Sequence, residues 1–218
     1  MTRRRIYVMR HAHVAYFEHG RPLPPETVPL TERGREQARA AAGLLEGLVF
    51  DRVITSGLPR TVETARIVAP GIEPEGWPEL REIEPGRLSE IPEDELERAF
   101  VDAWRDVVPE EARFLGGESV AALLDRVLPA VDRLLSDADW DVVLAVLHGG
   151  VNRAILSYAL TRGRAFLGNL EQSPGCINVL DVGDDWVVRA INVTPTDPAH
   201  RGPRLRTMEE LWAEFRRP

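Results

Sequence analysis

The sequence contains no lysine, and all 27 of its basic residues are arginine. This absence excludes every mechanism that depends on a lysine side chain: a P-loop phosphate site, a Schiff base or a lysine general base. Positive charge offered to a substrate must therefore come from arginine, whose guanidinium stays protonated and presents forked donors.

Cysteine is nearly absent as well. Cys176 is the only one, so the chain forms no intramolecular disulfide and no zinc site built from several cysteines. No apolar run approaches the roughly 20 residues that a membrane-spanning helix needs. The apolar stretch after the N-terminal arginines is only four residues long, too short for the core of a signal peptide. We therefore expect a cytoplasmic protein without membrane contacts.

The overall composition is that of an ordinary globular protein. The chain has 218 residues, of which 44% are hydrophobic and 28% are charged, enough for one domain with a substantial core. The net charge of −8 argues against general nucleic-acid binding. We expect a single domain over residues 1–218. The oligomeric state stays open, a homodimer included.

The stretch from Ile6 to His13 is the most informative part of the chain. Four apolar residues predict a buried strand, and Arg10 and His11 follow it directly. In open α/β sheets, ligands bind beyond the carboxyl ends of the strands. A guanidinium supplies fixed charge there, and an imidazole accepts or donates a proton or acts as a nucleophile. The pair indicates an anionic substrate.

A second strand is predicted over residues 51–55, and a helix follows it. Ser56 and Arg60 therefore lie at another switch from strand to helix, the same kind of place as His11. Taken alone, Arg60 is best interpreted as a surface arginine that pairs with Glu63 across one helical turn.

The clearest strand covers residues 141–147, which are uniformly apolar after Asp141 and are expected to be buried on both faces. It ends at His148-Gly149-Gly150, and a helix is predicted from Val151 to about Leu160. Glycines let backbone N–H groups approach a ligand, and a helix N-terminus favours an anion. This position favours a functional role for His148 over a purely structural one.

Hydrophobic periodicity and turn residues predict the remaining elements. Gly20 and four prolines between residues 12 and 29 exclude a helix or a central strand and predict a long loop. Acidic residues from Glu79 to Glu84 are, on their own, ordinary solvated carboxylates. Helices are predicted at 31–48, 93–107, 120–135 and 208–215, and a strand pair at 177–181 and 186–193.

Five motifs occur in one order along the chain: Arg10-His11, Ser56-x-Leu58-x-Arg60-x-x-x-Thr64-Ala65, Leu80-Arg81-Glu82-Ile83-x-x-Gly86, Gly117-Glu118-Ser119 and Val146-Leu147-His148-Gly149-Gly150. Together they resemble the histidine phosphatase superfamily, also called phosphoglycerate mutase-like, over about residues 5–193. We expect an α/β fold with a mostly parallel central sheet, helices on both faces and an antiparallel edge. An inserted helical segment at about 76–138 is expected to lie over the site.

The resemblance implies a role for each motif residue. His11 would be the nucleophile that forms a phosphohistidine, and Glu82 would protonate the leaving oxygen and then activate water. The groups implied around the phosphoryl group are Arg10, Arg60, His148 and the backbone N–H of Gly149. No metal or other cofactor is implied, because arginines neutralise the charge. The expected activity is that of a phosphomonoesterase acting on a small molecule or a phosphoprotein.

The sequence also departs from the family pattern. Ala12 replaces the usual glycine and removes the freedom of positive φ. Val14 and Phe17 stand where threonine or serine and then asparagine are common, and the asparagine contacts phosphate in many members. Either another residue, such as His13, supplies that donor or activity is lower. The family's common Trp-Glu-Gly after Gly86 is replaced by Leu88-Ser89-Glu90.

Three other interpretations remain open at this point. A mutase of the phosphoglycerate type uses the same nucleophile, but the altered residues after His11 make this less favoured. A catalytically silent module that binds a phosphorylated ligand is compatible with Ala12 and Phe17. A metal hydrolase would use His11 and His13 as ligands on one strand face, although no further ligand motif accompanies them.

Overall fold

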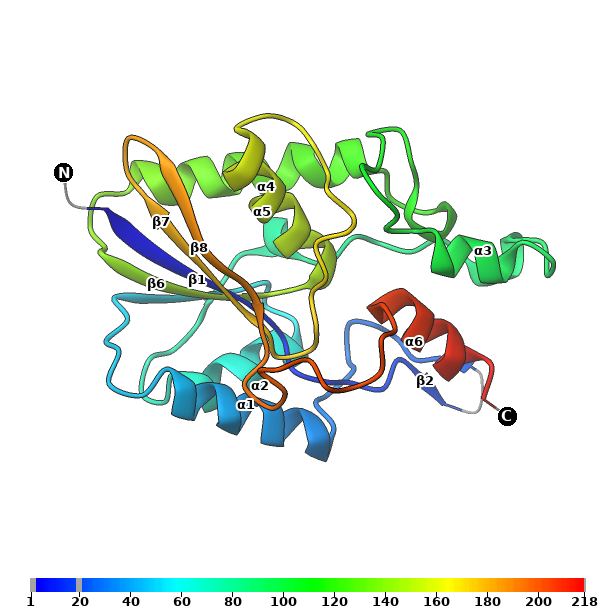
Figure 1. Ribbon diagram of the computed structural model, residues 1–218, viewed down its shortest axis with the longest axis horizontal. Helices are drawn as coiled ribbons and strands as arrows, with labels where there is room; N and C mark the ends of the chain where they lie inside the picture. The colour runs from blue at the N-terminus through cyan, green and yellow to red at the C-terminus, as the bar shows by residue number, and fades with distance from the viewer. Residues whose placement is uncertain (1–2, 19–20, 218) are drawn as a thin grey trace.

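A six-stranded sheet, in the order β5-β4-β6-β1-β7-β8, forms the centre of the computed structural model, which describes residues 3–18 and 21–217 (Figure 1). The strands are β1 (Arg4–Arg10), β4 (Arg52–Thr55), β5 (Glu75–Gly76), β6 (Val142–Leu147), β7 (Ile177–Val182) and β8 (Trp186–Val193). β5, β4, β6 and β1 are parallel, and β7 and β8 add an antiparallel pair at one edge. The predicted mostly parallel sheet with an antiparallel edge is confirmed.

Helices cover both faces of the sheet, as predicted. The helices α1 (Glu32–Leu44) and α2 (Pro59–Val68) lie on one face, and α4 (Val120–Ser136) and α5 (Gly149–Thr161) lie on the other (Figure 1). The side chain of Thr31 caps α1 by accepting the N–H of Gly34 at 3.1 Å, and Ser119 caps α4 in the same way. Such a cap contributes about 1 kcal/mol.

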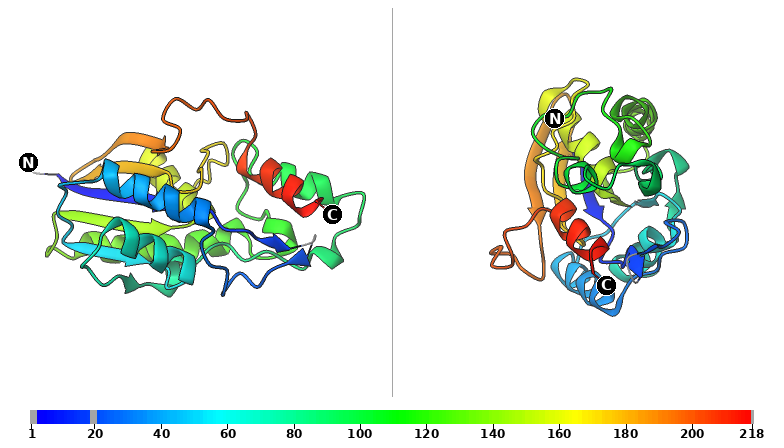
Figure 2. Two further views of the ribbon diagram at one scale, coloured as in Figure 1. Left: turned by 90° about the horizontal axis from the view of Figure 1, so that it is seen from below. Right: turned by 90° about the vertical axis from the view of Figure 1, so that its right-hand side faces the viewer.

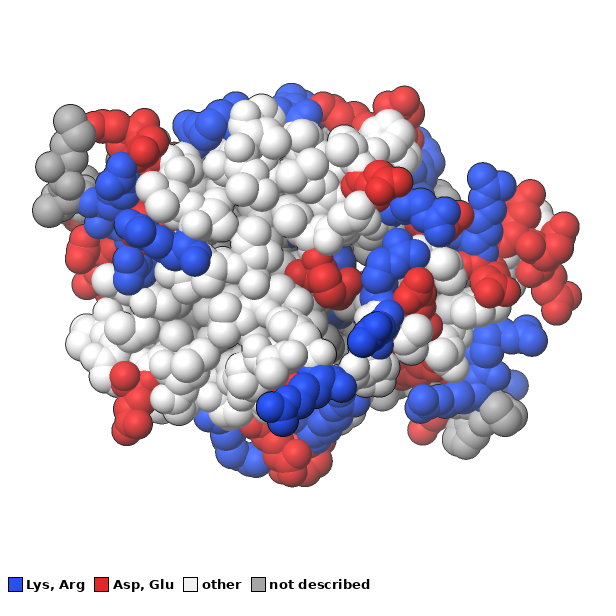
Figure 3. Space-filling view, viewed as in Figure 1, with Lys and Arg blue, Asp and Glu red and all other residues white. Residues whose placement is uncertain are grey.

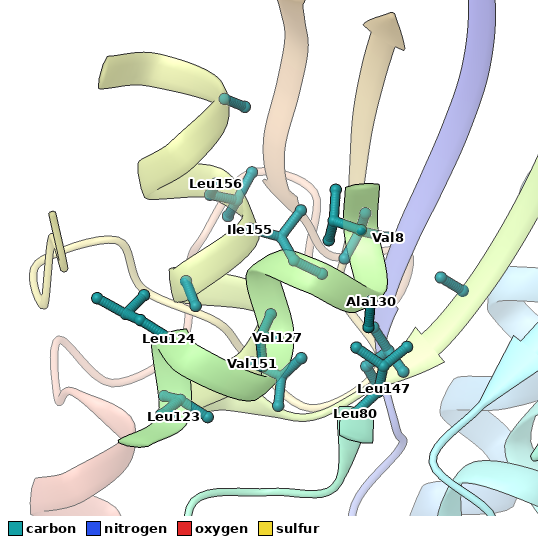
Figure 4. Close-up of a cluster of buried hydrophobic side chains, with 14 of the residues drawn as sticks. Val8, Leu80, Leu123, Leu124, Val127, Ala130, Leu147, Val151, Ile155 and Leu156 are labelled. Carbon is teal, nitrogen blue, oxygen red and sulfur yellow. The ribbon is translucent and has the colours of Figure 1, made fainter. Parts of the chain in front are cut away.

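The central strands are apolar throughout because both of their faces are buried. Along β1, Ile6 and Val8 join the core under α4 and α5, whereas Tyr7 and Met9 join the core under α1 and α2. Figure 4 shows the first of these cores, in which apolar side chains of α4 and α5 meet Val8 and Leu147 of the sheet. The amphipathic stripe on residues 120–135 is therefore core packing.

A second group of elements lies beyond the carboxyl ends of the parallel strands. It consists of the loop residues 12–18 and 21–29, which include the short ladder β2 (Phe17–Glu18) and β3 (Arg21–Pro22), with α3 (Leu96–Val101) and α6 (Thr207–Phe215). We call this group the cover. Figure 2 shows α6 beside α3. Phe17, Phe100 and Phe215 join the three parts, with ring centroids 5.4–6.4 Å apart.

Residues 76–138 contain α4 and several shorter elements. Three 3₁₀ turns, η1 (Pro78–Leu80), η2 (Leu88–Glu90) and η3 (Phe114–Gly116), accompany α3 before α4 begins. The predicted helix at 93–107 is wrong in extent, because α3 stops at Val101. Asp106 has φ 53°, and the next residue, Val107, bridges to Leu167, so the chain leaves the helical path there.

The sequence analysis also missed β5 and placed the start of α5 two residues late. In the described ranges, no helix is both long enough and apolar enough to cross a membrane. Charged side chains crowd the end of the molecule that carries α3, whereas the face over the β7–β8 edge shows few of them (Figure 3).

Candidate active site

The parallel order of β4, β6 and β1 brings three predicted site segments to one edge of the sheet. Arg10 pairs with Leu147 in register, and the N–H of His11 donates to the Leu147 carbonyl at 2.9 Å. His148 follows Leu147 directly, so the two imidazoles lie side by side with ring centroids 5.2 Å apart. On the other side of β6, Thr55 pairs with Val146, which places Ser56 next to His148.

His11 is held in one tautomer by its backbone neighbour. Its Nδ1 lies 2.8 Å from the carbonyl oxygen of Ala12, which can only accept, so Nδ1 carries the hydrogen. Burial, followed by the charges of Arg60 and Arg10, lowers the pKa of His11 well below its ordinary value of 6.5. At neutral pH the imidazole is therefore neutral, and Nε2 carries a free electron pair suited to nucleophilic attack.

His148 is fixed by a chain of hydroxyl groups. Its Nε2 lies 2.7 Å from the Ser56 hydroxyl, which in turn contacts the Thr61 hydroxyl at 3.1 Å. Thr61 donates to the Leu58 carbonyl, so Ser56 must donate to Thr61 and accept from His148. His148 thus carries its hydrogen on Nε2. Burial first, and Arg60 next, lower the pKa of this imidazole well below 6.5.

Two arginines lie beside these histidines with their charges uncompensated. Arg10 and Arg60 are only 5% and 1% exposed, and in residues 3–18 and 21–217 neither forms an ion pair with a carboxylate. Arg10 donates through Nη1 to the Gln172 carbonyl at 2.6 Å, and Arg60 donates through Nη1 to the Pro25 carbonyl. Within the described residues the Nε atoms of both, and Nδ1 of His148, have no hydrogen-bond partner.

The interpretation of Arg60 as a surface arginine paired with Glu63 is wrong. Glu63 instead binds Arg35 of α1 at 2.7 Å, so it is not available to Arg60. The Arg60 guanidinium points inward and lies with its central carbon 5.8 Å from the centre of the Tyr16 ring. Burying an unpaired charge costs several kcal/mol, so a site with two such arginines is built for an anion.

Glu82 reaches the same place from the turn that follows η1. Its carboxylate accepts the N–H groups of Gly150 and of Ile83, each at 3.0 Å. A Cβ atom on Gly150 would lie 2.7 Å from Glu82 Oε1, so a larger residue there would push the Glu82 carboxylate from its place. A Cβ atom on Gly149 would lie 3.6 Å from Arg10 Nε and 3.7 Å from Glu82 Oε2, which places these two side chains around Gly149.

Gly149 is the first residue of α5, after the cap residue His148. Its N–H is one of those that a helix leaves without an internal partner, at the end where the helix dipole favours an anion. The six residues singled out by the sequence, Arg10, His11, Arg60, Glu82, His148 and Gly149, are therefore brought together by the structure.

Sequence reasoning missed the residue that holds Glu82. Arg126 of α4 donates through Nη1 to the carbonyls of Glu79 and Arg81, both at 2.7 Å, and through Nη2 to the Glu82 carbonyl at 3.2 Å. The same guanidinium pairs with Glu118 at 2.8 Å. Position 126 lies on a predicted amphipathic helix, where an arginine carries no local signal of this role.

The departures from the family pattern are largely accommodated by packing. Ala12 is fully buried and donates its N–H to the Thr64 hydroxyl, and it is not among the described residues with positive φ. Val14 joins the core under α1 and α2, and Phe17 joins the aromatic cluster of the cover. The family's glycine and asparagine positions therefore serve packing here.

Nδ1 of His13 is not directed at His11 or His148. That nitrogen lies 2.8 Å from the Thr31 hydroxyl, and the backbone N–H of His13 donates to Gln37, both on the α1 side of the loop. Tyr16 instead places its hydroxyl 3.1 Å from Nε2 of His11. Over the described ranges, no group of three or more His, Cys, Asp or Glu residues is arranged to hold a metal ion.

Comparison with known proteins agrees with this geometry. The sequence pattern of the histidine phosphatase superfamily (branch 1) matches residues 6–194. An adenosylcobalamin/alpha-ribazole phosphatase of Salmonella typhimurium is 29% identical over 187 residues, which cover 82% of this chain and 90% of that protein. A probable phosphoglycerate mutase of Serratia proteamaculans is 32% identical over 160 residues, which cover 71% of this chain and 74% of that protein.

A solved structure of similar fold is the mycobacterial glucosyl-3-phosphoglycerate phosphatase. It superposes with a TM-score of 0.69 at 25% identity, and the match covers 87% of this chain and 99% of that one. Residues 6–194, which match the family pattern, contain every site residue described above. The chain therefore belongs to the histidine phosphatase superfamily and is a phosphatase, a hydrolase of phosphoric monoesters.

Proposed function

We propose that the protein hydrolyses a phosphorylated small molecule through a phosphohistidine formed on His11. One observation carries the proposal: Arg10 and Arg60 each keep a buried guanidinium nitrogen without a described partner beside the neutral imidazole of His11. A phosphoryl group bound there would meet positive charge, free donors and the nucleophile together. Because no lysine exists in the chain, the two arginines supply the charge.

The first step transfers the phosphoryl group to the protein. Nε2 of His11 attacks phosphorus while the bond from phosphorus to the ester oxygen breaks, and protonated Glu82 gives its proton to that oxygen. Arg10 and Arg60 stabilise the charge that the equatorial oxygens carry in the transition state. The N–H of Gly149 lies at the positive end of α5, so it adds a donor for the same oxygens.

The second step returns the protein to its starting state. Glu82, now a carboxylate, takes a proton from water while the water oxygen attacks the phosphohistidine. The bond between nitrogen and phosphorus breaks, inorganic phosphate leaves, and Glu82 is protonated again. The hydrogen that His11 keeps on Nδ1 through its bond to Ala12 leaves Nε2 unprotonated for the next cycle.

The substrate class is inferred from the relatives. The two phosphatases named above act, by their names, on adenosylcobalamin or alpha-ribazole compounds and on glucosyl-3-phosphoglycerate, and neither is named for a protein substrate. In this chain the aromatic cluster of Phe17, Phe100 and Phe215 joins the parts of the cover to one another. We expect a small phosphate ester rather than a phosphoprotein.

Trapping the intermediate tests the proposal. We expect p-nitrophenyl phosphate, followed by an alkaline quench, to leave one phosphoryl group on the peptide that contains His11, as read by mass spectrometry. The signal should persist after exhaustive chelation of metals. Phosphate release without any labelled peptide under single-turnover conditions would contradict the phosphohistidine, and loss of activity on chelation with recovery on adding zinc would favour a metal hydrolase.

A second arm separates hydrolysis from transfer. The labelled protein is mixed with water alone or with a sugar-acid phosphate, and the destination of the phosphoryl group is measured. Release as inorganic phosphate in both mixtures supports the proposal. Transfer of most of the label to the added acceptor would instead assign the protein to the mutases.

A further inference from the structure

The hydroxyl of Tyr16 lies on the side of His11 Nε2 from which phosphorus must approach this nitrogen. It lies 3.1 Å from Nε2 of His11. Since Nδ1 carries the hydrogen that is bound to the Ala12 carbonyl, Nε2 carries none, and the phenol is the donor of this bond. The electron pair that attacks phosphorus is thus the pair that accepts from Tyr16.

The cover, and not the sheet, sets the position of Tyr16. Its carbonyl accepts the N–H of Leu23 at 2.8 Å across the β2–β3 loop, and the adjacent Phe17 packs on α6 through Phe215. The backbone N–H groups of Phe17 and Tyr16 lie close enough to Glu214 of α6 to offset part of the rise that burial causes in its pKa. The Tyr16 ring also lies beside the Arg60 guanidinium. These contacts keep the Tyr16 ring beside the site when its hydroxyl gives way to the substrate.

We propose that Tyr16 is a catalytic residue that masks Nε2 in the free protein and donates its O–H to a phosphoryl oxygen once the substrate is bound. This inference rests on the proposed function of His11. Phosphorus has to approach along the Nε2 electron pair, so the O–H must release it. The released donor then lies beside the reacting nitrogen, within about one hydrogen-bond length of the equatorial oxygens.

The exchange is energetically favourable because the new acceptor is charged. Hydrogen bonds to an anionic oxygen are shorter and roughly twice as strong as those between neutral partners. The tyrosine keeps its proton throughout, so the exchange breaks one hydrogen bond and makes another. The charge on the equatorial oxygens is spread over a trigonal arrangement in the transition state, and a donor placed there adds to Arg10 and Arg60.

Tyr16→Phe tests the inference, because it removes the hydroxyl and little else. Loss of one donor to a developing oxyanion typically lowers kcat about 10²-fold, and we expect a fall of this order with alkyl and aryl phosphates alike. Vanadate, which mimics the trigonal transition state, should lose affinity by a larger factor than inorganic phosphate. Tyr158→Phe, on the far part of α5 against Trp186, is the matched control and should change neither quantity.

Nitrogen NMR supplies a readout that does not depend on turnover. With the phenol removed, neutral Nε2 loses a donor, so the pKa of His11 should rise and its Nε2 resonance should move toward that of an unbonded nitrogen. Unchanged His11 resonances, or kcat and vanadate affinity within about 3-fold of the wild type in a variant of equal melting temperature, would overturn the role of Tyr16. Phosphohistidine trapping in the wild type decides the proposed function separately, since it does not involve Tyr16→Phe.

Discussion

The active site has two halves that are built differently. One half, the base, consists of Arg10, His11, Arg60 and His148, which lie within a few residues of the ends of β1, β4 and β6 and are at most 5% exposed. The other half, the cover, contributes groups from distant parts of the chain, among them the Thr207 hydroxyl at 3.3 Å from Arg10 Nη1.

This difference in construction indicates that the base and the cover have different roles in the reaction. In the proposed mechanism the base supplies the nucleophile and the positive charge, and its geometry follows from the register of three neighbouring parallel strands. The cover adjusts and shields that geometry: the Pro25 carbonyl binds Arg60, and Tyr16 binds the nucleophile itself. Mutations in the base should therefore remove the chemistry, whereas mutations in the cover should change its rate or selectivity.

The largest effect is expected at His11, and it tests whether the base alone holds the nucleophile. His11→Ala should lower kcat with p-nitrophenyl phosphate by at least about 10⁴-fold, because no other group can form the covalent intermediate. His13→Ala, two residues away, removes only a contact to Thr31 and should retain most of the activity. Equal losses in the two variants would contradict the division and would favour a site that uses both imidazoles as ligands.

The next largest effect on activity is expected at Glu82, which belongs to neither the base nor the cover. Glu82→Gln cannot protonate a leaving group, so kcat should fall about 10²–10⁴-fold for alkyl phosphates. The first phosphoryl transfer should slow much less for p-nitrophenyl phosphate, because its leaving group is stable as an anion. Burst kinetics measure that step separately from hydrolysis of the intermediate. Glu84→Gln, on the same turn, is the control; equal slowing of the first step for both leaving groups would remove Glu82 from the role of acid.

A smaller effect is expected at Arg126, which positions Glu82 without touching the substrate. Arg126→Met frees three carbonyls of the turn at 79–82 and leaves the half-buried Glu118 without its partner. We expect about 1–3 kcal/mol less stability in urea unfolding and about a 10-fold lower kcat for alkyl phosphates, with a weaker loss for p-nitrophenyl phosphate. Arg133→Met removes an exposed pair with Glu79 and serves as the control. A loss that is the same for both substrates would show that Arg126 acts on stability alone.

The smallest effect concerns the pH dependence of stability, and it reports on the two histidines of the base together with His13, whose pKa burial also lowers. Folding lowers the pKa of His11 and of His148, so the folded chain binds fewer protons than the unfolded chain below pH 6.5. The contribution of these two histidines to the free energy of unfolding should therefore be complete above about pH 6.5. It should be lost as the pH drops toward their folded pKa values, by at most about 1.4 kcal/mol per pH unit for each histidine. Urea unfolding from pH 8 to pH 5 measures this slope.

His148→Gln should remove a large part of that slope, whereas His200→Gln, at an exposed position, should leave it unchanged. A slope that is the same in all three proteins would show that the buried histidines are not held neutral by folding. Added inorganic phosphate should also raise the unfolding free energy of the wild type, because it binds only the folded base.

The sequence was sufficient to predict the base because its signals are local. A buried apolar run identifies a strand, and the residue after it lies at the ligand-binding edge of the sheet. That reasoning located His11 and His148 correctly. It failed for Arg60, because an arginine three residues before a glutamate on a helix indicates a surface pair, and the true partner of Glu63 is Arg35 on another helix.

The cover could not be predicted, because long-range contacts determine it. After α3 ends at Val101, the chain leads to a bridge between Val107 and Leu167, about sixty residues away in the chain, where the sequence pattern predicts more helix. The roles of Tyr16 and Arg126 depend in the same way on which backbone or ring lies opposite them. Neither residue has a local pattern that separates it from an ordinary loop tyrosine or a surface arginine on a helix.

The direction of β1 has a practical consequence for handling the protein. This strand begins at Arg4, at the end of the sheet away from the site, and its last residue, Arg10, lies in the site (Figure 1). The last helix, α6, packs instead on α3 and on the ring of Phe17. An affinity tag or a fluorescent fusion joined ahead of β1 therefore extends away from the candidate active site. The same fusion joined after α6 adds bulk directly beside the groups that shield the nucleophile, so kinetic work calls for the N-terminal version.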